Sequence, residues 1–230
     1  MFPIGDDNPT NSKPVLTLAM VGICIAVFVY QFTLPPAEAE AFIFRWGFIP
    51  SDVLGKAGLG AEADEVPAWA KIFSSMFLHG DFMHIIGNML FLWIFGNNIE
   101  DTFGKVRFLI FYLLCGVAAA MTQAFTNTAS GVPMIGASGA ISGVLGAYLF
   151  LFPHARVRVL VMFGIITVVH LRAIIVLGLW FVLQLVNAAL TPINEEGGVA
   201  FWAHVGGFVA GLALVLVFRP ARPRVKGPWG

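Results

Sequence analysis

Six apolar stretches dominate the hydrophobic pattern of this chain, and polar or charged residues separate each one from the next. A helix needs about 20 apolar residues to cross a 30 Å hydrocarbon core. The stretches predicted to span a membrane are 15–34, 77–96, 106–126, 138–152, 173–190 and 199–218. The fourth is short, because it begins late, on a serine. The pattern therefore predicts an all-α membrane protein, a bundle of six transmembrane helices with a short central helix.

A seventh apolar stretch, 157–169, has about 13 residues and lies between arginines and His170. That length favours an interfacial or re-entrant segment over a span. At the N-terminus, Lys13 and the "AEA" at 37–39 resemble a secretion signal. The stretch 15–34 is longer than a signal core of about 7–15 residues, so we expect it to remain as a span.

The composition agrees with a protein whose main solvent is lipid. Hydrophobic residues make up 58% of the chain and charged residues only 11%, with a mean hydropathy of +0.85. Soluble domains have about 25% charged residues. The net charge is zero, which gives no electrostatic support for nucleic-acid binding. Cys24 and Cys115 lie inside apolar stretches and read as buried hydrophobes, not as a disulfide or metal site.

Charges differ between the two sides of the predicted membrane. The basic residues of one side are Lys105, Arg107, Arg156, Arg158, Arg172, Arg219, Arg222, Arg224 and Lys226. The other side has two basic residues, Arg45 and Lys56, and these acidic ones: Glu38, Glu40, Asp52, Glu62, Asp64, Glu65, Glu195 and Glu196. Since basic residues favour the cytoplasmic side, both termini are predicted to be cytoplasmic.

This topology divides the chain into three parts. Residues 1–14 form a cytoplasmic N-terminal segment, 15–218 the six-span domain with a long outer loop at 35–70, and 219–230 a basic cytoplasmic tail. No large domain is appended, which favours the inner (plasma) membrane of a bacterium or archaeon. No obligate protein partner is evident from the pattern.

Polar side chains inside the spans gather at one predicted depth. At 1.5 Å per residue, Ser138 and His204 each lie roughly 21 Å from the cytoplasmic ends of their helices. His84 lies roughly 18 Å from the predicted end of its helix, and Asn88 is one turn deeper on the same face. Three spans therefore place Ser, His and His some 10 Å below the outer surface of a 30 Å core, which suggests a shared site.

Small residues favour close contact between two of these spans. Gly139, Gly143 and Ala147 recur every fourth position after Ser138, and Gly207 and Gly211 follow His204. Small residues at this spacing let helix backbones approach closely in lipid. The contact would bring the serine hydroxyl within reach of the imidazole.

A serine beside a histidine base is a minimal activated nucleophile. Ser138 begins a helix, where free backbone N–H groups stabilise an oxyanion, and His84 and Asn88 can donate to the same charge. No aspartate lies at this depth, so we expect a Ser138–His204 dyad whose histidine is held by packing.

Each of these features also has a plainer interpretation. A serine at a helix start is most often an N-cap, and a membrane histidine often makes an interhelical hydrogen bond. His79, His84 and His204 could instead bind a metal, but the chain has no HExxH motif and no carboxylate partner at that depth. The "GASGA" at 136–140 is not a GxSxG elbow, because Ala140 occupies the last glycine position.

Three segments resemble the rhomboid family of intramembrane serine proteases, over residues 66–218. They are "HGDFMHIIGNMLFLWIFGNNIEDTFG" (79–104), "GASGAISG" (136–143) and "AHVGGFVAG" (203–211). The resemblance implies that Ser138 is the nucleophile and His204 the general base, with His84, Asn88 and the Ser138 N–H in the oxyanion hole. It implies structural roles for His79, Gly96, Glu100, Gly104, Gly136, Gly139, Gly207 and Gly211.

The chain departs from the family at two places. A Trp-Arg pair is frequent before the histidine that matches His79, and here Ala70 and Lys71 stand there, with Trp69 one position early. Some members carry a tyrosine one turn after the serine, stacked on the catalytic histidine, and here that position is Ser142.

The expected function is that of a serine endopeptidase that cleaves single-span membrane proteins within or near the bilayer, with a site open to the outer side. Water would reach the serine above the short helix, and substrates would arrive laterally past 173–190. No cofactor and no metal are expected. The alternatives are a catalytically inactive protein that binds membrane clients and, less favoured, a small transporter.

Overall fold

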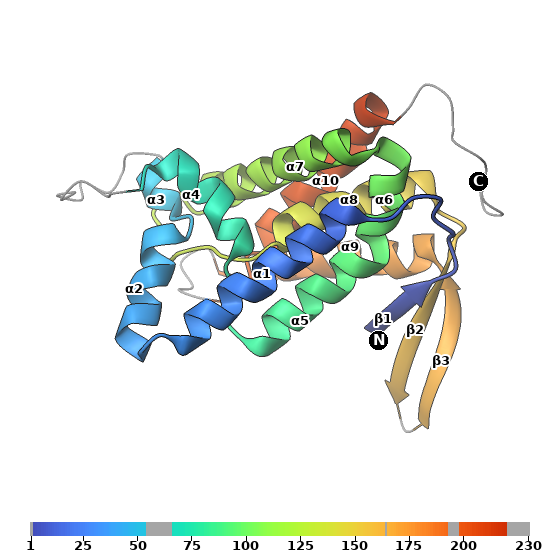
Figure 1. Ribbon diagram of the computed structural model, residues 1–230, viewed down its shortest axis with the longest axis horizontal. Coiled ribbons are helices and arrows are strands. Elements are labelled where there is room, and N and C mark those ends of the chain that lie inside the picture. Colours follow the sequence, from blue (N-terminus) through green and yellow to red (C-terminus); the bar gives the residue numbers. More distant parts are fainter. Residues whose placement is uncertain (1, 54–65, 164, 193–197, 220–230) are drawn as a thin grey trace.

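The computed structural model describes residues 2–53, 66–163, 165–192 and 198–219. The chain forms a helical bundle with a small sheet at one end (Figure 1). In chain order, the elements are β1 (Phe2–Asp6), α1 (Val15–Thr33), α2 (Pro36–Trp46), α3 (Pro50–Val53), α4 (Ala68–Ser74), the 3-10 turn η1 (Ser75–Phe77), α5 (Phe82–Phe91), the π turn η2 (Leu92–Gly96), α6 (Asn97–Phe103), α7 (Lys105–Thr126), α8 (Ser138–Leu151), β2 (Arg156–Phe163), β3 (Ile165–Arg172), α9 (Ala173–Leu190) and α10 (Phe201–Phe218).

The prediction of a helical membrane protein is confirmed, with five of the six expected helices long enough to span. Within the described residues, five helical runs are long and apolar enough to cross a membrane: α1, the continuous run α5–η2–α6, α7, α9 and α10. The shorter apolar helix α8 begins at Ser138 and has 14 residues. The protein is therefore a mostly helical membrane protein.

The second span was predicted at the wrong place. It runs from Phe82 to Phe103 instead of 77–96. The helix begins late because the Asp81 carboxylate caps it by accepting the backbone N–H of His84. It ends late because polar residues after Gly96 continue the helix, and the buried carboxylate of Glu100 finds partners at the start of α1. The depth assigned to His84, reckoned from Gly96, was therefore wrong.

The prediction of an all-α fold is also wrong, because 157–169 is not helical. It lies in the antiparallel hairpin of β2 and β3, and β1 adds a third strand in the order β1-β2-β3. Val157 and Val159 are buried while Arg156 and Arg158 are exposed. This alternation, with many β-branched residues, is a strand signal present in the sequence.

The N-terminal segment, which carried no signal in the sequence, ties this sheet to the helices. The backbone of Asp7 pairs with that of Arg156, and the Asn8 carbonyl accepts from Asn98 of α6. The Tyr148 hydroxyl of α8 donates to the Asp6 carboxylate. Burial at this contact raises the pKa of Asp6 to about 6, against the partly opposing effect of the Tyr148 hydrogen bond.

The sheet lies at what we call the basic end of the bundle, the end that carries Arg107, Arg156, Arg172 and Arg219 (Figure 1). The opposite end, called here the loop end, carries α2, α3 and α4. Lys71 is buried in this loop and lies 3.3 Å from the Asp52 carboxylate, while Trp69 is largely exposed. A buried cation thus occupies the place where the family often has an arginine. Most of the tail 219–230, Lys56, Glu62, Asp64, Glu65, Glu195 and Glu196 lie outside the described residues.

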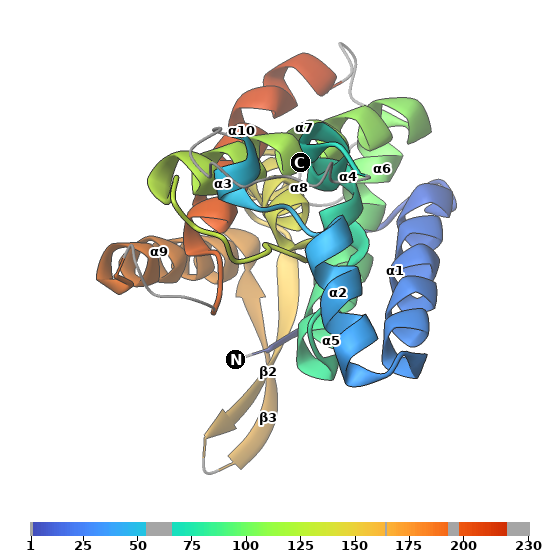
Figure 2. The same cartoon turned by 90° about the vertical axis from the view of Figure 1, so that its left-hand side faces the viewer.

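Helix α8 is the centre of the bundle, as Figure 2 shows from the loop end. From Ala140 to Tyr148 every residue of α8 is buried, with α7 and α10 packed against it. A buried apolar helix that is too short to cross the membrane leaves room above its first residue. Ser138 therefore begins its helix inside the bundle and below the loop end.

Candidate active site

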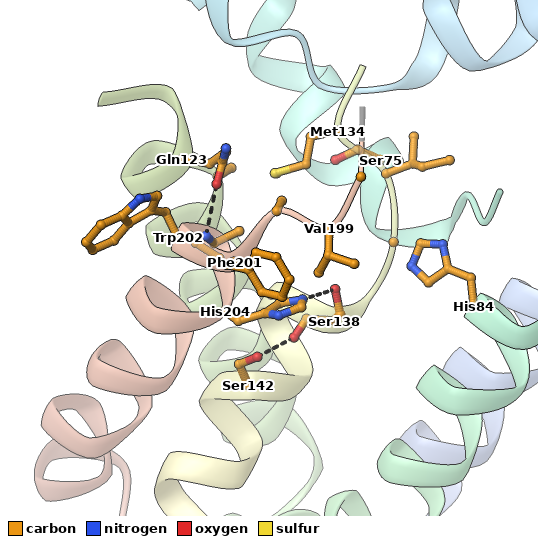
Figure 3. Close-up of a pocket in the computed structure, with 18 of the residues that line it drawn as sticks. Ser75, His84, Gln123, Met134, Ser138, Ser142, Val199, Phe201, Trp202 and His204 are labelled. Atoms are coloured by element: carbon orange, nitrogen blue, oxygen red, sulfur yellow. Dashed lines mark hydrogen bonds between the residues drawn. The ribbon is translucent and has the colours of Figure 1, made fainter. Parts of the chain in front are cut away.

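The side chains of Ser138 and His204 meet at the start of α8. The distance from Ser138 Oγ to His204 Nε2 is 2.8 Å, which is a hydrogen bond (Figure 3). His204 lies in the first turn of α10 and is 9% exposed. The predicted pair is therefore assembled from two helices that are 66 residues apart in sequence.

Glycines of α10 make this contact possible. A Cβ atom on Gly207 would lie 2.0 Å from the Gly139 carbonyl oxygen, and one on Gly211 would lie 2.0 Å from the Gly143 carbonyl oxygen. The backbones of α8 and α10 thus touch directly. Gly139 and Gly143 themselves face Ala119 and Cys115 of α7. Small residues on three helices therefore fix the position of the serine against the histidine.

The other ring nitrogen of His204 also has a partner. Its Nδ1 lies 2.8 Å from the side-chain oxygen of Gln184 on α9. The expectation that packing alone holds this histidine is therefore wrong. The sequence did offer a signal, since Gln184 is a polar residue inside an otherwise apolar span, and such residues are usually functional.

Aromatic rings complete the surroundings of His204. The ring of Trp180 on α9 lies 6.0 Å away between centroids, and Phe201 of α10 meets it edge-on at 6.4 Å. Ser142, at the position of the family's tyrosine, donates to the Ser138 carbonyl at 2.6 Å instead (Figure 3). The aromatic contact to the histidine thus comes from α9 and α10, and not from α8.

His84 faces the same region from α5. Its Nδ1 accepts the backbone N–H of Gly80 at 3.4 Å, which leaves the proton of the neutral ring on Nε2. A Cβ atom on Gly136 would lie 2.5 Å from that Nε2, and the φ angle of Gly136 is +117°. Only glycine combines this backbone angle with such close approach. The segment before Ser138 therefore passes directly over a ring N–H donor, and Figure 3 shows this arrangement.

Several of the side chains described so far border a single cavity, which further hydrogen-bond donors also line. Its volume is about 760 Å³, and Ser138, His204, His84 and Asn88 all border it. The Asn88 amide donates to the His84 carbonyl at 3.0 Å. The first N–H groups of a helix lack intrahelical acceptors, and those of α8 begin at Ser138. The structure thus brings together all four residues predicted for the site.

The supporting residues lie in two places. At the loop end, His79 is buried with its ring 5.1 Å from that of His84, and its backbone carbonyl and N–H pair with the Gln31 side chain. A residue that the sequence reasoning missed, Gln123 of α7, accepts the Ala203 N–H and so holds the start of α10 (Figure 3).

At the basic end, Glu100 accepts the backbone N–H groups of Leu16 and Thr17 at 2.9 and 2.8 Å, which fixes the start of α1. Gly104 has a φ of +79° between α6 and α7. A Cβ on Gly96 would lie 3.3 Å from the Thr17 side chain. Glu100 and Gly96 thus lie at the junction of α1 with the second span, and Gly104 makes the turn from that span into α7.

The chemistry open to this site is that of a nucleophile with a base. The serine hydroxyl can give its proton to His204 Nε2, and neutral donors surround the place where negative charge would develop. Within the described part of the chain, no three His, Cys, Asp or Glu side chains are grouped to hold a metal ion. The alternative of a metal bound by His79, His84 and His204 thus finds no support in that part.

Comparisons with known proteins identify the family. The Rhomboid domain model matches residues 67–221. The chain is 32% identical over 210 residues to "Rhomboid protease GluP" of Bacillus subtilis, covering 90% of this chain and 36% of that protein. It is 32% identical over 151 residues to "Rhomboid protein 1, mitochondrial" of Saccharomyces cerevisiae (64% and 39%), and 31% identical over 159 residues to "RHOMBOID-like protein 5" of Arabidopsis thaliana (68% and 47%). The chain thus spans less than half the length of these relatives. The chain belongs to the rhomboid family.

Proposed function

We propose that this rhomboid is an intramembrane serine endopeptidase that cleaves single-span membrane proteins. The observation that carries the proposal is the 2.8 Å hydrogen bond between Ser138 Oγ and His204 Nε2 at the start of a buried helix. A serine that only capped its helix would bond to its own backbone and would need no imidazole. A permeation path would not require this pairing either.

In the proposed reaction, His204 Nε2 takes the proton of Ser138 as Oγ attacks the scissile carbonyl carbon. The new oxyanion receives hydrogen bonds from the Ser138 N–H, His84 Nε2 and Asn88 Nδ2. The protonated imidazole then gives its proton to the leaving amine, which leaves an acyl-enzyme on Ser138. Water, deprotonated by the same histidine, hydrolyses the ester and regenerates the hydroxyl.

The position of the serine supports a substrate that is partly unwound. Carbonyl groups inside a helix are hydrogen-bonded, so a transmembrane substrate must open locally before Ser138 can attack. Helix-breaking and small residues in the substrate therefore help. We further propose that the basic end faces the cytoplasm and that the site opens to the outer side, because basic residues favour the cytoplasmic side. A bacterial or archaeal plasma membrane stays a prediction from sequence.

The proposal is tested on the purified full chain in detergent, with a single-span substrate and a fluorophosphonate probe. Wild type should cleave the substrate and be labelled, while Ser138→Ala should lose both and His204→Ala should lose cleavage. Ser142→Ala, which removes a hydroxyl one turn along α8, should keep the label. A wild-type chain that neither cleaves nor labels would instead fit a binding protein or transporter. Cleavage that survives in Ser138→Ala would sink the assignment of the nucleophile.

The oxyanion donors are tested separately. His84→Ala and Asn88→Ala should each lower kcat by roughly 10²-fold, since each removes one donor to a developing charge. Both variants should still bind the substrate, so KM should change little. An unchanged kcat in both would remove these side chains from the mechanism and leave only the Ser138 N–H.

A further inference from the structure

Helix α9 is the least buried of the membrane helices around the site, yet it supplies the partner of His204 Nδ1. Of its 18 residues, three are buried: Ala173, Leu177 and Ala188. Long apolar side chains such as Leu179 and Leu183 are about half exposed. Gln184 is a polar residue on this otherwise apolar helix, and its side-chain oxygen lies 2.8 Å from His204 Nδ1.

We propose that Gln184 is a positioning residue that holds His204 in the tautomer and orientation needed to accept the proton of Ser138. The inference rests on the proposed protease function and deepens it. It replaces a two-residue site, held by packing, with three side chains from three helices that form one hydrogen-bonded chain from Ser138 through His204 to Gln184.

The tautomer follows from the chemistry of the amide oxygen. Gln184 Oε1 is only an acceptor, so its partner Nδ1 must carry a proton. In a neutral imidazole the lone pair is then on Nε2, which is the atom 2.8 Å from Ser138 Oγ. The opposite tautomer would point an N–H at the serine and could not take its proton. After proton transfer the imidazolium has two N–H groups, and both retain an acceptor.

Other contacts of α9 fix the register of this hydrogen bond. Trp180 lies one turn before Gln184 and faces the same imidazole. Phe181 stacks on Phe208, one turn beyond His204, with centroids 4.3 Å apart and planes 16° from parallel. The orientation of the base therefore depends on where α9 lies against α10. An outward movement of α9 would withdraw the acceptor from Nδ1 and slow the chemical step.

The experiment compares Gln184→Leu with Gln184→Glu. Leucine has a similar size but accepts no hydrogen bond, so kcat should fall roughly tenfold to a hundredfold with KM within about twofold. Fluorophosphonate labelling of Ser138 should slow by the same factor, because this small reagent needs the activated serine but no lateral passage past α9. Glutamate retains an acceptor, so Gln184→Glu should recover most of the labelling rate. Its carboxylate also favours the imidazolium, which moves the acidic limb of the pH–rate profile to higher pH.

Leu183→Ala serves as the matched control, because it truncates an exposed neighbour on the same helix and should leave both rates within about twofold. Wild-type rates in Gln184→Leu would overturn the inference while the protease assignment stands. Slower cleavage with normal labelling would also overturn it, since Gln184 would then act on substrate access. Equal losses in Gln184→Leu and Gln184→Glu would show a structural role instead. Only an unlabelled wild type would count against the proposed function itself.

Discussion

The pair α8–α10 and the helix α9 border the same cavity but are held in opposite ways. In the pair, glycines let two backbones touch, and Gly207 has no room for even one methyl group. On α9, by contrast, Gly178 has nothing within 4 Å of its would-be Cβ, and most long side chains are exposed. Helix contacts in lipid depend on close packing, because the surrounding tails are as apolar as the side chains. The serine and histidine are thus fixed by a tightly packed pair, and a helix with few buried residues supplies the third hydrogen-bond partner.

The strongest test of this comparison adds one methyl group to α10 and, in a second variant, one methyl group to α9. Gly207→Ala puts a Cβ 2.0 Å from the Gly139 carbonyl oxygen, so the helices must separate, and activity should be lost. Gly178→Ala makes the same chemical change on α9 and should leave activity within about twofold. Cleavage and thermal unfolding in detergent measure both variants. Equal effects of the two substitutions would contradict the contrast.

A second test addresses the segment that leads into α8. Gly136→Ala places a Cβ 2.5 Å from His84 Nε2 at a φ of +117°, so either the backbone or the imidazole must move. Because this displaces an oxyanion donor, kcat should fall roughly 10²-fold. Gly131→Ala, with nothing within 4 Å of the new Cβ, is the control. Normal kcat in Gly136→Ala would mean that the His84 ring adjusts freely and that this side of the site is not rigid.

Substitutions at the packing contacts of α9 should lower the cleavage and labelling rates only partly. Phe181→Ala removes the stacked contact of α9 with Phe208 and leaves Gln184 in place. An aromatic pair contributes about 0.5–1.5 kcal/mol beyond its buried area, so both cleavage and labelling should fall roughly two- to tenfold. Leu179→Ala, a truncation of an exposed residue on the same helix, should change neither. A complete loss in Phe181→Ala would show that α9 is held as firmly as the pair.

The smallest expected effect lies at the basic end, where Asp6 meets Tyr148 of α8. Burial raises the pKa of Asp6 from 3.8 to about 6, so the docked strand β1 binds a proton more tightly than a free segment does. Docking is therefore most stable below pH 4 and weakens as the pH rises through 6. The protection of the backbone amides within residues 2–6, measured as their exchange relative to an unstructured peptide at the same pH, should fall roughly tenfold between pH 5 and pH 7.5. Asp6→Asn should remove this dependence, and cleavage should change little because the tight pair holds Ser138.

Much of the architecture could be predicted because a helix that crosses lipid needs a long stretch of apolar residues. Apolar length located α1, α7, α8, α9 and α10 within a few residues of their observed bounds. The rule failed where polar residues continue a helix, as in α6, because the partners of Glu100 lie 83 and 84 residues away in sequence. It also failed at β2 and β3. The length of this stretch suggested a membrane segment, whereas the alternation of exposed Arg156, buried Val157 and exposed Arg158 indicates a strand.

For the site, the sequence by itself indicated four residues that the structure places around one cavity: Ser138, His204, His84 and Asn88. Ser138 begins a helix that is too short to span, and Gly207 follows His204 at a spacing that favours close helix contact, so the pairing of the two helices was predictable. Only the tertiary structure decided how the imidazole is oriented. The oxygen of Gln184 reaches Nδ1 because α9 settles against α10 in one register, and the strand β1 reaches Tyr148 because the hairpin offers an edge. Such choices depend on distances between segments far apart in sequence, and local periodicity carries no information about those distances.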